Sequence, residues 1–120
     1  MRFMSIYRTQ ETDHPPCPEE FAQMGAFVDE MTKSGVLIAT GGCLPSALGA
    51  RVRASNGKLS VTDGPFTETE ELVAGFAILE CKSKDEAIEL AKRFLKVVGG
   101  DGESEVRQMA EFGGDTTCVS

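Results

Sequence analysis

The residues most able to do chemistry gather in one acidic stretch, VTDGPFTETEE, at residues 61–71. The carboxylate of Asp63 could act there as a general base or accept a hydrogen bond from a ligand. The same Asp-Gly-Pro-Phe tetrapeptide is typical of a tight turn, because Asp accepts hydrogen bonds from following backbone N–H groups and Pro65 fixes the exit of the chain. We predict that Asp63 bonds N–H groups within residues 64–68, that Phe66 anchors the turn in the core, and that any ligand comes second.

Three glutamates follow this turn, at positions 68, 70 and 71. Crowded carboxylates raise one another's pKa, which would suit a general acid and makes Glu68 a candidate ligand contact. Thr67 and Glu70 also stand at capping-box spacing, so a helical turn explains the same residues. A solvated acidic face is the favoured interpretation.

Two residues from the ends of the chain complete the predicted site. Tyr7 could donate a hydrogen bond, and Arg107 could hold a carboxylate or an enolate. Both are expected at the edges of a pocket, although both could be ordinary strand residues. The candidate ligand-binding residues are therefore Tyr7, Asp63, Pro65, Phe66, Glu68 and Arg107, and Asp63 is the candidate catalytic residue.

Metal and phosphate chemistry are not indicated by the sequence. The only histidine, His14, has Asp13 and Cys17 nearby, which is too small a ligand set, and the four cysteines share no metal-finger spacing. No phosphate-binding glycine loop and no nucleophile elbow occurs. We predict no bound metal and no cofactor.

Length and charge narrow the class of protein. The 120 residues suit a single domain over residues 1–120, with a frayed tail at 113–120. The net charge of −7 disfavours direct binding to nucleic acid and to anionic membranes, which both require a basic surface. No segment has the length of a signal peptide or a membrane span, and the cysteines stand singly, so a cytoplasmic protein with reduced thiols is expected.

Hydrophobic periodicity supplies the elements that would position these residues. Strands are predicted at Phe3–Tyr7, Val36–Ala39, Ala50–Ala54, Lys58–Val61, Leu72–Cys81 and Glu105–Phe112. A first helix opens at Pro18, buries Phe21, Met24, Phe27, Val28 and Met31, and closes at a left-handed Gly35. A second helix follows the capping box of Ser83 and Glu86 and buries Ala87, Ile88, Ala91, Phe94, Leu95 and Val98, with Glu89 and Arg93 able to pair on its outer face.

This order predicts an α+β, ferredoxin-like sandwich with an inserted β-hairpin, whose turn is Asn56-Gly57. Two helices would cover one face of the sheet. The strand LVAGFAIL is nevertheless apolar at both alternations, with Leu72, Ala74, Phe76 and Ile78 in one set and Val73, Ala77 and Leu79 in the other. A second copy packed sheet against sheet is the simplest cover, so we expect a homodimer with a small-molecule cleft near the interface.

Several stretches resemble the YCII-related family, in its DGPF subgroup: MRFMSIYR, GVLIATGGCLPS, GARVR, VTDGPFTETEELVAGFAIL, KSKDEAIELAKRF and SEVRQMAEF. The resemblance implies a dimeric α/β barrel of the ferredoxin-like type and, through the neighbourhood of DGPF members, a connection with extracytoplasmic-function sigma factors. The wider family is associated with a His–Asp pair. Met24 stands where that His would be, and CLPSALG offers no Asp.

Two functions follow as hypotheses. The first is a small-molecule binding protein, with weak acid–base activity as an option, whose pocket lies near the dimer interface. The alternative is a non-catalytic regulatory or interaction module linked to sigma-factor transcription. A pocket lined by Tyr7, Asp63 and Arg107 would favour the first, and an exposed apolar patch beside a solid core would favour the second.

Overall fold

The computed structural model describes residues 1–10, 18–66 and 71–110 of the chain. The elements in these ranges are β1 (Arg2–Thr9), α1 (Pro18–Lys33), β2 (Leu37–Gly42), the short 3₁₀ turn η1 (Ser46–Leu48), β3 (Ala50–Ser55), β4 (Lys58–Asp63), β5 (Leu72–Glu80), α2 (Lys84–Val98) and β6 (Glu103–Gln108). Their order is the one predicted from periodicity. No helix in these ranges is long and apolar enough to cross a membrane.

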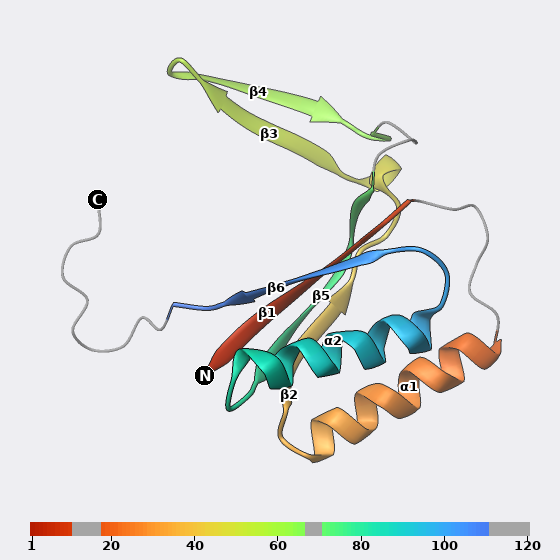
Figure 1. Ribbon diagram of the computed structural model, residues 1–120. Helices are drawn as coiled ribbons and strands as arrows, with labels where there is room; N and C mark the ends of the chain where they lie inside the picture. The colour runs from red at the N-terminus through yellow and green to blue at the C-terminus, as the bar shows by residue number, and fades with distance from the viewer. Residues whose placement is uncertain (11–17, 67–70, 111–120) are drawn as a thin grey trace.

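The main sheet has the strand order β2-β5-β1-β6, and every neighbouring pair is antiparallel. Helices α1 and α2 lie together on one face of it (Figure 1). This is the α+β, ferredoxin-like arrangement expected from the sequence. Within residues 1–10, 18–66 and 71–110, the opposite, outer face of the sheet carries no helix.

The inserted hairpin forms a second sheet of its own, in which β3 pairs with β4. Asn56 and Gly57 both have positive φ, at 51° and 78°, as the tightest hairpin turn requires. Figure 1 shows the hairpin standing away from the main sheet, on the side opposite the helices. All twelve strand residues of the hairpin are exposed.

Helix boundaries follow the local chemistry of the chain. Helix α1 begins at Pro18 and is followed by Gly35 at a φ of 81°, with the Val36 N–H donating to the Met31 carbonyl at 3.1 Å. At the start of α2 the Ser83 hydroxyl accepts from the Glu86 N–H at 3.2 Å. The Glu86 carboxylate in turn accepts from the Lys82 N–H at 3.3 Å, one residue before the expected partner.

A bulge in β5 changes which side chains reach each face. Tyr7 is paired with Gly75 but Arg8 with Val73, so Ala74 is an extra residue in the ladder. Leu72 is consequently buried on the helix side, whereas Val73 shares the outer face with Phe76 and Ile78. The strict alternation expected for LVAGFAIL is therefore wrong at its first half and correct after the bulge.

The core lies between the helices and the centre of the sheet. Its buried residues are Phe3, Leu79, Cys81 and Ala87, packed against Val36, Leu37, Ala77, Leu90 and Val106. Burial raises the pKa of the Cys81 thiol, with the nearby Glu86 carboxylate adding to the effect. Cys81 is therefore an inert packing residue, and it and the exposed Cys43 are free thiols.

Three detailed expectations are wrong. Phe21 is 64 % exposed instead of buried, because it lies outside the helix face that meets the sheet. Glu89 pairs with Lys92 at 3.2 Å, while Arg93 reaches Glu30 on α1 at 2.7 Å. The last strand ends at Gln108, so its predicted end at Phe112 was too late.

Candidate functional site

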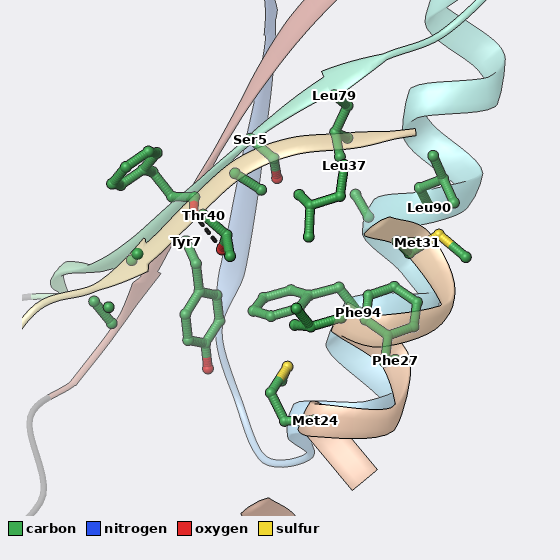
Figure 2. A pocket seen from close by; sticks show the side chains of 18 residues that line it. Ser5, Tyr7, Met24, Phe27, Met31, Leu37, Thr40, Leu79, Leu90 and Phe94 are labelled. Atoms are coloured by element: carbon green, nitrogen blue, oxygen red, sulfur yellow. Dashed lines mark hydrogen bonds between the residues drawn. The ribbon is translucent and has the colours of Figure 1, made fainter. Parts of the chain in front are cut away.

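A cavity of about 340 Å³ lies between the two helices and the sheet, and we call it the inner cavity. Figure 2 shows its side chains converging from both layers. The wall consists of Ser5, Tyr7, Met24, Phe27, Val28, Met31, Leu37, Thr40, Gly41, Gly42, Ala74, Gly75, Phe76, Ala77, Leu79, Leu90, Ala91 and Phe94. Its size lies within the range of small-molecule sites in proteins.

Small residues in the sheet create this space. On the helix side of the sheet, Gly75 of β5 is paired with Gly42 of β2 and Ala77 with Thr40, where bulkier side chains would otherwise fill the layer. A Cβ at position 75 would come within 2.9 Å of the Gly41 carbonyl oxygen, so close strand packing requires glycine there. The apolar residues of α1 that line the inner cavity are Met24, Phe27, Val28 and Met31, and they leave this volume unfilled.

Tyr7 and Phe94 meet inside the cavity. Their ring centroids are 5.1 Å apart and their planes are inclined by 83°, an edge-to-face contact between β1 and α2. The Tyr7 ring also packs on Gly102, where an added Cβ would come within 2.7 Å of its Cε1 atom. Two neighbours thus hold the ring in place, and its hydroxyl reaches the same end of the cavity as Met24 (Figure 2).

Few polar groups are available to a ligand in the inner cavity. The Thr40 hydroxyl donates to the Phe76 carbonyl at 2.9 Å, and the Ser5 hydroxyl is bonded to that of Ser104 at 3.1 Å. Among the described lining residues none is charged, and Tyr7 is the one titratable group. The Tyr7 hydroxyl has no hydrogen-bond partner within the described part of the chain.

A wider cleft adjoins the inner cavity and shares Tyr7, Met24 and Ala74 with it. Its volume is about 770 Å³, and its wall includes Glu20 and Asp101 as well as the exposed Phe21. The C-terminal end of α2 contributes Val97, Val98, Gly99 and Gly100. Tyr7 and Met24 therefore stand between an apolar interior and a more polar, open exterior.

The two helices are tied together over the inner cavity. Arg93 of α2 lies 5.2 Å above the ring of Phe27 and also bonds Glu30, both on α1. These contacts are on the surface and contribute little individually, but they fix the helix carrying Met24 and Phe27 relative to α2.

The Asp-Gly-Pro-Phe tetrapeptide forms the base of the hairpin and lines neither the inner cavity nor the wider cleft. The Phe66 N–H donates to the Ser46 hydroxyl at 3.0 Å, and the Gly64 N–H donates to the Gly49 carbonyl at 2.9 Å. A Cβ at position 64 would overlap the Ser46 carbonyl, so only glycine fits. The guanidinium of Arg51 covers the Phe66 ring at 3.9 Å.

The predicted hydrogen bonding of Asp63 is wrong for residues 64–66. The N–H groups of Gly64 and Phe66 bond elsewhere and Pro65 has none, so Ser46 takes the role foreseen there for the carboxylate. The N–H groups of residues 67 and 68 lie outside the described residues. Asp63, Pro65 and Phe66 lie apart from Tyr7, and of the predicted ligand contacts only Tyr7 lines the inner cavity. Glu68 lies outside the described residues, as do His14 and Cys17.

Arg107 lies on the outer face of the sheet, opposite the cavity. It is paired with Met4, whereas the cavity residue Ser5 is paired with Val106. Arg107 bonds Glu105 at 3.1 Å, and Arg8 bonds the same carboxylate at 2.8 Å. The hydrogen bond from Arg107, then that from Arg8, lowers the pKa of Glu105.

No group of three potential metal ligands occurs in the part of the chain that is described. The wall residues that the sequence did not reveal as a site are apolar helix residues, most of which were predicted to be core, together with residues of strands β1, β2 and β5. Met24, which the resemblance aligned with a histidine of the family, lines the cavity together with Tyr7.

Comparison with known proteins gives a consistent assignment over most of the chain. The family model of the YCII-related domain matches residues 1–112. An uncharacterised protein of Rhizobium meliloti (strain 1021) is 33 % identical over 89 residues, which cover 74 % of this chain and 72 % of that protein. The structure of 5-chloro-2-hydroxyhydroquinone dehydrochlorinase from Burkholderia phenoliruptrix AC1100, in complex with 2,5-dihydroxybenzoquinone, is similar with a TM-score of 0.47 at 17 % identity, over 93 % of this chain and 96 % of that one.

Proposed function

The chain belongs to the YCII-related domain family, and from that premise we propose that it binds a small, uncharged, largely apolar molecule in the inner cavity. Within the family we assign it to the DGPF subgroup on residues 63–66. A second copy of the chain covers the outer face of the sheet, so that the cavity lies one strand layer away from the dimer interface.

The observation that carries this proposal is the composition of the cavity wall. An uncharged wall offers a charged ligand no compensation for its lost hydration, so it selects neutral molecules. The Tyr7 hydroxyl supplies one directional contact, suited to a ligand hydroxyl or carbonyl. The expected ligand is therefore a small, largely apolar molecule with one such group.

Binding is favoured over catalysis. Asp63 lies at the hairpin base, away from the cavity wall, so an acid–base step in the cavity would have to use Tyr7. Methionine stands at position 24, where the family resemblance placed a histidine, and its thioether transfers no proton. We therefore propose a carrier or sensor of its ligand, with weak acid–base activity left to Tyr7 alone.

The experiment uses the protein's own fluorescence. The chain has one tyrosine and no tryptophan, so its intrinsic emission reports on Tyr7. An uncharged naphthylamine dye that enters the cavity should quench this emission through energy transfer while its own emission rises. Enlarging a wall residue by Ala91→Met should weaken dye binding by about tenfold.

The matched control is Ala26→Met, because Ala26 is exposed on α1. It should bind the dye like wild type, and thermal melts of both variants establish that they fold. If Ala91→Met has a lowered melting temperature, Tyr7→Phe provides a second test. Wild type should bind naphthol more tightly than naphthalene, and Tyr7→Phe should bind the two equally. Equal dye affinity in all three proteins would place the dye elsewhere and refute the proposal.

A second candidate function, the interaction module linked to sigma-factor transcription, is supported by one observation. The hairpin exposes Val52, Leu59 and Val61, which is the kind of apolar patch that a protein partner covers. This patch is distinct from the cavity, but it can be covered by only one partner at a time, either a second copy of the chain or another protein.

A further inference from the structure

Hairpin β3–β4 has an apolar face that the rest of the described chain leaves uncovered. Its register places Val52 opposite Val61 and Ala54 opposite Leu59, so these side chains share one face. Val52, Leu59 and Val61 are 70 %, 77 % and 67 % exposed. The strands contact each other but have few contacts with the other helices and strands.

A two-stranded hairpin without a packing partner is only marginally stable in water. The base of this hairpin is nevertheless fixed, through the Gly64–Gly49 and Phe66–Ser46 hydrogen bonds and the Arg51–Phe66 contact. The hairpin is thus an anchored arm rather than a loose loop. An anchored arm with an uncovered apolar face requires a surface to lie on.

The other face of the hairpin is polar and basic. Arg51 and Arg53 lie there opposite Thr62 and Ser60. Residues 50–63 contain three basic side chains and one acidic side chain, which is a net charge of +2. Since the whole chain has a net charge of −7, the remaining residues have a net charge of −9. The arm and the rest of the chain therefore carry net charges of opposite sign, which favours the approach of one copy's arm to the body of another copy.

The outer face of the main sheet has an apolar area on β5 and β1, beside the charged cluster of Arg8, Glu105 and Arg107. Val73 and Phe76 are 46 % and 39 % exposed there, and the register adds Met4, Ile6 and Ile78. The hairpin stands on this same side of the molecule, away from the helices (Figure 1). A two-fold axis would make the contact reciprocal, each copy offering one arm and receiving one.

We propose that the β3–β4 hairpin is a dimerisation arm, whose apolar face lies on the outer sheet face of a second copy. A stable interface needs roughly 20–30 residues from each partner, and the outward positions of the four strands supply only about a dozen. The face of the hairpin that carries Val52 and Val61 adds about six residues from each copy, which brings the total close to this range. This inference rests on the second copy in the proposed function, but it does not depend on any ligand.

The test compares two aspartate substitutions at neighbouring positions of β4. Val61→Asp places a charge on the apolar face, and Ser60→Asp places the same charge on the opposite face. Both sites are exposed, so neither change disturbs the core. In sedimentation experiments wild type should have twice the 12.9 kDa chain mass. Val61→Asp should raise the dimer dissociation constant by about tenfold or more, and Ser60→Asp by less than about threefold.

A photocrosslinking amino acid in place of Leu59 locates the contact. It should join two copies of the chain, with the crosslink on the peptide containing Val73, Phe76 and Ile78 of the partner. A dimer equally tight in Val61→Asp would overturn the arm while leaving the sheet-face dimer standing. A monomeric wild type would overturn both, and would favour a different, acidic protein as the occupant of the arm. Dye binding measured in Val61→Asp tests the cavity separately, because no arm residue lines it.

Discussion

The ring of Tyr7 meets the ring of Phe94 edge to face, with centroids 5.1 Å apart and an interplanar angle of 83°. This contact joins the central strand β1 to helix α2 beside the cavity. The positive edge of one ring against the negative face of the other favours this geometry over stacking. The contact fixes the orientation of the Tyr7 ring, so that its hydroxyl points into the cavity and is available to a ligand.

Removing Phe94 should destabilise the fold and enlarge the inner cavity. Phe94→Ala is expected to lower the free energy of unfolding by about 2 kcal/mol, less than a fully buried ring because Phe94 is partly exposed. Urea unfolding measures this change. The matched control is Phe21→Ala on α1, whose ring is 64 % exposed, and it should change stability by no more than about 0.5 kcal/mol. Equal losses in the two variants would contradict the assignment of Phe94 to the cavity wall.

Gly102 should control the position of the Tyr7 ring. In Gly102→Ala the new Cβ would come within 2.7 Å of Tyr7 Cε1 and 2.9 Å of its hydroxyl oxygen, so the ring has to move. We expect altered tyrosine emission and weaker dye binding. Gly25→Ala is the control, because nothing lies within 4 Å of a Cβ there. It should leave the emission unchanged and stabilise α1 by up to about 1 kcal/mol. Identical emission in both variants would refute the contact.

Ser46, rather than Asp63, should carry the energetic weight of the hairpin base. Ser46→Ala removes the acceptor of the Phe66 N–H and is expected to cost about 1 kcal/mol, because that donor lies in a partly buried position. Asp63→Ala should leave the melting temperature nearly unchanged. Thermal melts of the two variants decide the point, and a larger loss in Asp63→Ala would restore the carboxylate to the turn.

The Arg8–Glu105–Arg107 cluster should make stability depend on acid pH. The pKa of Glu105 is lower in the folded protein than its ordinary value of 4.5, so this contribution is fully present above that value. It is lost as the pH falls through the folded pKa. Glu105→Gln should therefore flatten the stability profile below pH 4.5. Denaturant unfolding across this range measures the difference, and parallel profiles would show that the cluster contributes nothing.

The sequence was sufficient for the architecture because local signals agreed with one another. Asn56-Gly57 fixed the hairpin, Ser83 fixed the start of α2, and the apolar periodicity fixed the helices. The face assignment of β5 failed at Ala74, since a bulge depends on how two strands fit together and leaves no mark in one strand's own pattern.

The site was harder to predict for a related reason. A cavity is missing volume, which arises here from how Gly75 and Ala77 of β5 pair with Gly42 and Thr40 of β2. Apolar residues around a cavity have the same periodicity as apolar residues in a filled core. The polar residues Asp63 and Arg107 were predicted to belong to the site, but Asp63 lies at the end of the hairpin and Arg107 lies on the outer face of the sheet. Among the described candidate residues, Tyr7 alone was predicted from the sequence and also lines the inner cavity.

The backbone bond from Gly64 to Gly49 brings the two ends of residues 50–63 to within 2.9 Å between donor and acceptor. A segment whose ends meet can be shortened, lengthened or exchanged without redirecting the chain on either side. The arm is therefore modular: its reach and its surface chemistry can diverge while the βαββαβ body and its cavity stay the same. Grafting a different hairpin between these two glycines would change which molecules the protein assembles with and leave what it binds inside untouched.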